Sequence, residues 1–168
     1  MSKNEALFSI RPAELRDAEA IVEIYNQSVL ETTATFDIEP RSLSKQTELL
    51  TNRSPKHPVF VAEQEGRVVA WASVGSWSDR AGYRFSGETS VYVDKNHWGK
   101  GIGKRLMHEL VSTAQSQGLH TLLARISTEN LSSIRIHETF GFKEAALLKE
   151  VGFKFERYID VVILQKLL

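Results

Sequence analysis

The most informative stretch of this chain is Val91-Tyr92-Val93-Asp94-Lys95-Asn96-His97-Trp98-Gly99-Lys100-Gly101-Ile102-Gly103-Lys104-Arg105-Leu106. It reads as a strand, a glycine-rich turn and the start of a helix in direct succession. Glycine has no Cβ, so Gly99, Gly101 and Gly103 can adopt the positive φ values that turn backbone N–H groups toward one point. The helix that follows adds unpaired N-terminal donors and the positive end of its dipole. Basic side chains accompany the turn at Lys100, Lys104 and Arg105. The stretch predicts a site for a phosphate or pyrophosphate group, with a turn that binds no ligand as the alternative.

Two common nucleotide motifs do not fit this stretch. A P-loop requires a serine or threonine after Gly-Lys, whereas Arg105 follows Gly103-Lys104 here. The dinucleotide fingerprint Gly-x-Gly-x-x-Gly lacks its third glycine whether it is started from Gly99 or from Gly101. The turn is therefore not expected to serve a nucleoside triphosphatase or a Rossmann-type protein.

Composition narrows the class of protein. With 168 residues, 42% of them hydrophobic and 25% charged, we expect one globular domain over residues 1–168. The net charge of zero argues against a dedicated nucleic-acid binder, so a small molecule is the expected ligand. The absence of cysteine excludes disulfides, a thiolate nucleophile and thiolate metal ligands, and the histidines show no metal-binding spacing with carboxylates. The chain shows neither a signal pattern nor a bilayer-spanning apolar run, so we expect a cytoplasmic protein without a membrane partner.

Hydrophobic periodicity and turn residues predict the order β-α-α-β-β-β-α-β-α-β-β. The predicted strands cover residues 7–11, 59–64, 68–76, 88–93, 119–126, 142–146 and 157–164. The first predicted helix begins at Asp17, which precedes a periodic apolar run. The other predicted helices cover residues 42–51, 103–117 and 132–140. Because hairpins alternate with β-α-β crossovers, this order predicts an α/β fold with a mixed, mostly antiparallel central sheet flanked by helices.

Two motifs, taken together, resemble those of the GNAT superfamily of acyl-CoA-dependent N-acyltransferases over nearly the whole chain. Its cofactor motif Gln/Arg-x-x-Gly-x-Gly/Ala is matched by Trp98-Gly99-Lys100-Gly101-Ile102-Gly103, with Trp98 departing from the usual first residue. Its second hallmark, an asparagine before a short helix that ends in Gly-Phe, is matched from Asn130 to Phe142. Further stretches resemble the phosphinothricin and methionine sulfoximine acetyltransferase branch, namely Gly82-Tyr83-Arg84, Glu88 to Val93, Arg135 to Glu138 and Val151 to Lys154.

The resemblance implies an acetyl-CoA site. In this superfamily two neighbouring strands, here 88–93 and 119–126, splay apart to admit the pantetheine arm. The backbone of residues 91–93 would pair with that arm and donate an N–H to the thioester oxygen, while residues 99–104 would bind the pyrophosphate. The implied cofactor-binding residues are Val91, Tyr92, Val93, Gly99, Lys100, Gly101, Ile102, Gly103, Lys104, Asn130 and Ser133. No metal is expected.

Two residues are candidate catalysts by the same resemblance. Glu88 would lie at the substrate amine as general base, with a pKa raised toward neutrality by burial beside aromatic groups. Its alternative is a solvated or salt-bridged strand glutamate. His137 occupies the position where many members have a tyrosine that protonates the leaving thiolate. Its alternative is a hydrogen-bonded core histidine.

The acceptor is expected to be a small amino acid analogue of the phosphinothricin, methionine sulfoximine or methionine sulfone type, acetylated on its free α-amine by direct attack. The expected substrate-binding residues are Phe36, Ala81, Gly82, Tyr83, Arg84 and Glu88, with Trp77 and Phe85 as further aromatic walls. The aromatic residues could equally be plain core. The cation for a substrate carboxylate is left open between Arg84, Lys154 and Arg157, and the branch implies a homodimer. The alternatives are a protein N-terminal acetyltransferase and a non-catalytic acyl-CoA-binding regulatory module, and a role in antibiotic or herbicide resistance or in metabolism is left open.

Overall fold

The computed structural model describes residues 8–168, so the first residue of the predicted strand 7–11 lies outside the described residues. The strands are β1 Ser9–Pro12, β2 Val59–Gln64, β3 Arg67–Ser76, β4 Ser86–Val93, β5 Thr121–Ser127, β6 Lys143–Lys154 and β7 Arg157–Leu167. The α-helices are α1 Ala18–Glu31, α2 Leu43–Thr51, α3 Ile102–Ser116 and α4 Leu131–Thr139, and short 3-10 turns η1 Leu15–Asp17, η2 Ala81–Tyr83 and η3 Lys95–His97 lie between them. None of the helices between residues 8 and 168 is long and apolar enough to cross a membrane.

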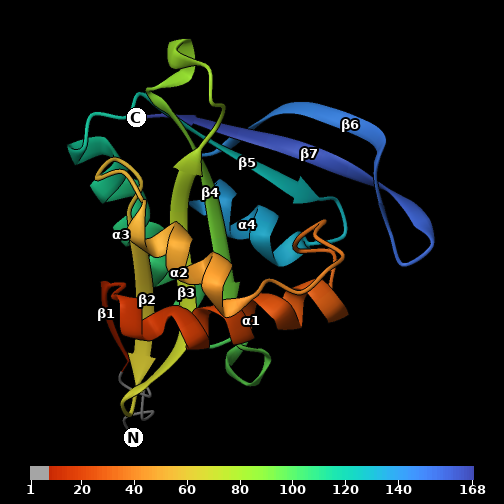
Figure 1. The fold of residues 1–168 in the computed structure, drawn as a ribbon. Helices are drawn as coiled ribbons and strands as arrows, with labels where there is room; N and C mark the ends of the chain where they lie inside the picture. The colour runs from red at the N-terminus through yellow and green to blue at the C-terminus, as the bar shows by residue number, and fades with distance from the viewer. Residues whose placement is uncertain (1–7) are drawn as a thin grey trace, which may run out of the picture.

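The strands form one seven-stranded sheet in the order β1-β2-β3-β4-β5-β7-β6 (Figure 1). Neighbouring strands are antiparallel except for β4 and β5, which run parallel and are joined by the α3 crossover. The parallel ladder is short, because it pairs residues 86–88 of β4 with residues 121–123 of β5 and then ends. The predicted mixed, mostly antiparallel α/β fold and the predicted splaying of these two strands are confirmed.

Two apolar cores hold helices on opposite faces of the sheet. One face carries Ala70, Ala72 and Leu122, and it packs against α3 through Leu106, Met107 and Leu110, all less than 1% exposed. The other face carries Val61 and Trp71, and it packs against α1 through Ile21, Ile24 and Val29. Since side chains alternate along a strand, successive residues of each strand point to opposite faces of the sheet and therefore to different helices. In β4, residues 87, 89, 91 and 93 face α3, and residues 86, 88, 90 and 92 face α1 and α2.

The last hairpin is longer than the sequence pattern predicts. The predicted strand 142–146 continues to Lys154 as β6, and a two-residue turn at Phe155 and Glu156, with φ of 51° and 58°, leads into β7. Nearly all of β6 is exposed at the sheet edge, so its sequence is not shaped by an alternation of buried and exposed faces. Figure 1 shows this hairpin projecting beyond the end of β5.

Candidate functional site

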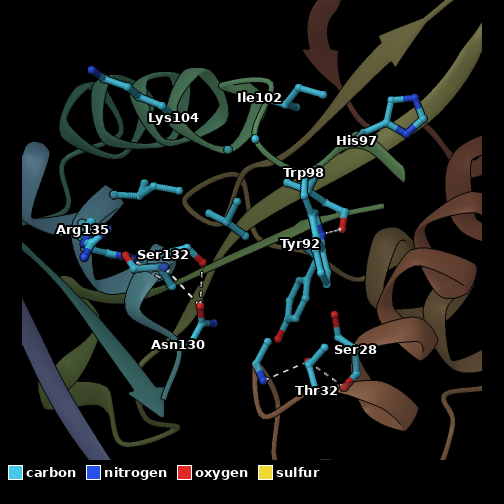
Figure 2. A pocket seen from close by; sticks show the side chains of 18 of the residues that line it. Ser28, Thr32, Tyr92, His97, Trp98, Ile102, Lys104, Asn130, Ser132 and Arg135 are labelled. Carbon is cyan, nitrogen blue, oxygen red and sulfur yellow. Dashed lines mark hydrogen bonds between the residues drawn. The ribbon is translucent and has the colours of Figure 1, made fainter. Parts of the chain in front are cut away.

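A cavity of about 660 Å³ opens where β4 and β5 separate. Its walls come from β4, from the turn before α3, from α4 and from the end of α1 (Figure 2). It is lined by Ser28, Thr32, Thr33, Ala34, Val91, Tyr92, Val93, His97, Trp98, Gly99, Lys100, Gly101, Ile102, Gly103, Lys104, Glu129, Asn130, Ser132, Ser133, Arg135, Ile136 and His137. All eleven cofactor-binding residues expected from the sequence are in this lining, and so is His137.

The glycine turn has the predicted conformation at two of its three glycines. Gly99 and Gly101 both have φ of 77°, and Gly101 is the N-cap of α3 without any side-chain cap. The first N–H groups of α3 are therefore presented to the cavity without an intrahelical or side-chain partner. The prediction of positive φ is wrong for Gly103, which lies inside α3. A Cβ there would come 3.2 Å from Ile136 and 3.6 Å from Val91, so this glycine lets α3 approach α4 and β4 closely.

The positive charge around the cavity is distributed differently from the expectation. Lys100 and Lys104 line it, but the Arg105 guanidinium lies 4.6 Å from the centre of the Phe8 ring and is absent from the lining. Arg135 of α4 is in the lining instead. Its helical spacing of three residues from Ser132, on the face that carries Ile136, is the sequence signal that could have identified it.

Trp98, which departs from the cofactor motif, and Asn130, which begins the second motif, both make hydrogen bonds that fix the local structure. Trp98 donates its indole N–H to the carbonyl of Val93 over 2.8 Å, which ties the turn to the end of β4. Asn130 is the N-cap of α4, and its Oδ1 accepts from the backbone N–H of Ser133 at 3.2 Å and from the Ser132 hydroxyl at 3.0 Å. The Asn130 motif thus fixes where α4 begins and which of its residues face the cavity.

One wall of the cavity was not expected from the sequence. Residues 32–34 follow α1, and this segment is held in place by Lys154, a residue that is 3% exposed. Lys154 Nζ donates to the carbonyls of Thr32 at 2.8 Å and Thr35 at 2.7 Å, and it lies 3.4 Å from the carbonyl of Ser28. Burial lowers the pKa of this ammonium. Because its donors are used inside the protein, Lys154 cannot be the cation that binds a substrate carboxylate.

Glu88 is the last residue of the β4 and β5 ladder, and its side chain, 19% exposed, lies on the α1 and α2 face. Its carboxylate is held by Arg125 of β5: Nε donates to Oε1 over 2.7 Å and Nη2 donates to Oε2 over 2.5 Å. The Arg125 guanidinium in turn lies 5.2 Å from the centre of the Trp77 ring. The aromatic surroundings expected for Glu88 are thus replaced by a direct ion pair with Arg125. This pairing also raises the pKa of Arg125.

His137 is buried, with 3% of its surface exposed. Its Nδ1 lies 2.8 Å from the carbonyl of Ser133, which can only accept, so Nδ1 carries the proton. Its Nε2 lies 2.9 Å from the hydroxyl of Thr89, next to the splay of β4. Burial lowers the pKa of this imidazole, which favours its neutral form. His137 therefore has a structural task, linking α4 to β4, alongside any catalytic one.

A second cavity of about 490 Å³ lies between α2 and the strands β3 and β4. Its lining includes Gly75, the cross-strand partner of Glu88, and the neighbouring pair Ser73 and Ser90. At the other end Trp71 is 5% exposed, and its Nε1 has no hydrogen-bond partner among residues 8–168. A Cβ on Gly75 would have no neighbour closer than the backbone oxygen of Glu88 at 4.0 Å, so the sheet face is open at Gly75. Glu88 itself lines neither cavity.

The expected substrate residues are not brought together within this chain. The ring of Phe36 packs on β6, where it occupies the space that a Cβ of Gly152 would need. Ala81 to Arg84 form the exposed η2 turn and its cap between β3 and β4, and they line neither of the two cavities. Arg157, another cation considered, pairs with Glu129 at 2.8 Å.

Known proteins share this arrangement. A family model described as an acetyltransferase (GNAT) domain matches residues 10–163. The L-methionine sulfoximine/L-methionine sulfone acetyltransferase of Salmonella typhimurium is 38% identical over 162 residues, covering 94% of this chain and 92% of that protein. The structure of ribosomal-protein-alanine N-acetyltransferase from Brucella melitensis matches with a TM-score of 0.92 and 41% identity, covering 95% of this chain and 99% of that chain. A GNAT superfamily phosphinothricin acetyltransferase from Sinorhizobium meliloti, in complex with acetyl-CoA, gives a TM-score of 0.92 and 34% identity, covering 96% and 88% of the two chains.

These matches extend over most of the chain and include the glycine turn, the strand gap and the Asn130 helix from which the cavity is built. The resemblance stated from the sequence is confirmed. The chain belongs to the GNAT acetyltransferase family and is an acetyl-CoA-dependent N-acetyltransferase.

Proposed function

We propose that this enzyme transfers the acetyl group of acetyl-CoA to the free α-amine of a small amino acid analogue of the methionine sulfone, methionine sulfoximine or phosphinothricin type. The observation that carries the proposal is the position of Glu88, at the point where the β4 and β5 ladder ends and directly across from Gly75, which lines the smaller cavity. The larger cavity suits the cofactor and the smaller one suits a small acceptor. The names of the relatives support this choice of acceptor.

The residues of the larger cavity fit coenzyme A. The α3 N-terminus and the Gly99 and Gly101 backbone would bind the pyrophosphate, with Lys100 and Lys104 adding charge. Residues 91–93 pair with β3 on one edge, while their other edge faces the gap beyond the end of the β4 and β5 ladder. This second edge can pair with the pantetheine arm and donate to the thioester carbonyl. When bound, acetyl-CoA supplies an activated acetyl group. We infer direct attack by the amine, since the chain contains no cysteine to carry the acetyl group.

We infer that Glu88 accepts the proton of the substrate ammonium. Its carboxylate lies on the face of the sheet that carries the smaller cavity, and the missing side chain of Gly75 leaves the way to that cavity open. The acceptor's side chain would then lie over Ser73 and Ser90. The role of His137 as general acid stays a prediction, because its contacts support the tautomer in which Nε2 is an acceptor rather than a donor.

We further infer a homodimer. The β6 and β7 hairpin carries exposed apolar side chains, among them Val151 at 59%, Phe153 at 56% and Tyr158 at 67% exposure. A twelve-residue edge strand with such a surface needs a cover. A second copy there would also add walls near Phe36, which packs on this hairpin. Light scattering on the wild type and on Phe153→Asp tests this, and a monomeric wild type at micromolar concentration would contradict it.

The proposed acceptor is tested by measuring thiol release from acetyl-CoA with a panel of amines. The panel contains methionine sulfone, methionine sulfoximine, phosphinothricin, a polyamine and a short peptide that begins with alanine. We expect the amino acid analogues to be preferred, and turnover confined to the peptide would instead indicate a protein N-terminus as acceptor. Glu88→Gln should lower kcat by about 10²- to 10⁴-fold, since general base catalysis contributes that much. Glu109→Gln, at a glutamate of α3 whose side chain is 46% exposed, is the control. Normal kcat in Glu88→Gln at neutral pH would exclude Glu88 as the base.

A further inference from the structure

Arg125 lies beside the proposed base and has no assigned task. Its guanidinium, with the side chain 56% exposed, is the donor to both carboxylate oxygens of Glu88. The ring of Trp77 lies beneath it at 5.2 Å. A guanidinium that lies over an aromatic ring and donates two hydrogen bonds to one carboxylate is restricted in its orientation. Arg125 is therefore a cation held directly beside the proposed base rather than a freely moving surface side chain.

The ion pair with Arg125 conflicts with the proposed role of Glu88 as general base. A carboxylate with each oxygen engaged by a guanidinium N–H must give up at least one of these bonds to take the proton of an ammonium. The pair must therefore rearrange when the acceptor binds. An amine alone would leave Arg125 without its anion, whereas an α-amino acid carries the opposite arrangement of charges. Its ammonium can meet Glu88 while its carboxylate meets Arg125, so that no charge is left unpaired.

The geometry of the fork permits this exchange. Only Nε and Nη2 take part in the bonds to Glu88, and Nη1 takes no part in the pair. Nη1 and the second N–H of Nη2 can therefore bind a carboxylate bidentately, at a side chain that is more than half exposed.

The other cations considered for the carboxylate lack this relation to the base. Arg84 lies 4.6 Å from the centre of the Phe85 ring and donates to the carbonyl of Ala81 at 3.3 Å. Lys154 is committed to buried carbonyls, and Arg157 pairs with Glu129. We propose that Arg125 binds the α-carboxylate of the acceptor and that this contact releases Glu88 from the ion pair. Glu88 then becomes able to accept a proton when the bound acceptor carries a carboxylate. The inference rests on the proposed function and names the residue that selects its substrate class.

The test compares one acceptor with and without its negative charge. Steady-state acetylation of methionine sulfone and of methionine sulfone carboxamide is measured for the wild type, Arg125→Gln and Arg125→Lys. The quantity of interest is the ratio of kcat/KM for the acid to kcat/KM for the amide, because the different amine basicities of the two compounds cancel when variants are compared. Arg16→Gln is the matched control, since Arg16 is also exposed and paired with a glutamate, Glu14, at 2.9 Å. Calorimetric titration with acetyl-CoA reports whether each variant keeps its cofactor site.

Arg125→Gln should lower the acid-to-amide ratio by about 10- to 150-fold, the range expected for loss of hydrogen bonds to a charged group. Arg125→Lys should give an intermediate ratio, and turnover of the amide by Arg125→Gln should equal or exceed that of the wild type because Glu88 is released. An unchanged ratio, or equal losses for acid and amide, would overturn the inference while leaving the proposed function intact. The same holds if Arg84→Gln, and not Arg125→Gln, abolishes the selectivity. A wild type that acetylates no amino acid analogue would overturn the proposed function and this inference with it.

Discussion

The buried ammonium of Lys154 gives a direct test of how the last hairpin supports the cofactor cavity. Lys154→Met keeps the length and the apolar stem of the side chain but removes the donors to the carbonyls of Thr32 and Thr35, at 2.8 and 2.7 Å. Each buried acceptor left without a partner costs about 1–3 kcal/mol. Removal of a buried charge offsets part of this loss. We expect the free energy of unfolding to fall by about 2–4 kcal/mol, which corresponds to about 4–16 °C in Tm for a chain of this size.

The assay is equilibrium unfolding in urea at pH 7, followed by tryptophan fluorescence and far-UV circular dichroism. Lys45→Met is the control, because Lys45 is an exposed helix residue paired with Glu48 at 3.0 Å, and its loss should not move the midpoint measurably. Since residues 32–34 line the cavity, Lys154→Met should also weaken acetyl-CoA binding, measured by calorimetry below the unfolding range. A loss of less than about 1 kcal/mol relative to Lys45→Met would refute the view that this ammonium holds the 32–35 segment in place.

Three further outcomes follow from the same structure. Gly152→Ala should lower the free energy of unfolding by about 1–3 kcal/mol, because its Cβ would overlap the Phe36 ring. Gly82→Ala is the control, because a Cβ there has no neighbour within 4 Å. Equal Tm values for the two variants would contradict this prediction. Gly101→Ala forces an alanine to φ of 77° at the N-cap of α3, so acetyl-CoA affinity should fall and the free energy of unfolding should drop by about 1–2 kcal/mol. Calorimetry measures the affinity and thermal melts measure the stability. Unchanged affinity would contradict this prediction. Burial lowers the pKa of His137, so below about pH 6.5 the unfolded chain binds a proton that the folded chain does not, and stability falls with falling pH. The stability difference between wild type and His137→Gln should therefore shrink by up to about 1.4 kcal/mol per pH unit below pH 6.5, and a difference independent of pH would exclude a neutral buried histidine.

Local sequence signals were sufficient where a feature depends on residues close along the chain. The helix predicted over residues 42–51 begins as expected, with Ser42 as its N-cap, and glycines 99 and 101 have the predicted left-handed conformation. Each of these rests on the conformational freedom of glycine or on a hydrogen bond to a residue within three positions. The order of strands and helices likewise follows from hydrophobic periodicity. For β6 this signal was missing, because an exposed edge strand does not alternate between core and solvent.

The sequence by itself determined the fold, the glycine turn and the cofactor-cavity residues that belong to the two motifs and to residues 91–93, since these depend on local pattern and on motifs shared with a family. The tertiary structure decided the electrostatics of the site. The Glu88 and Arg125 pair joins residues 37 positions apart, and the bonds from Lys154 to the end of α1 span more than 100 positions. Such pairs arise only when strand register and strand order bring the side chains together, because charge attraction depends on distance in space and not along the chain. Gly103 is a similar case, because its close contact from α3 to Ile136 of α4 depends on helix packing and not on a local turn pattern.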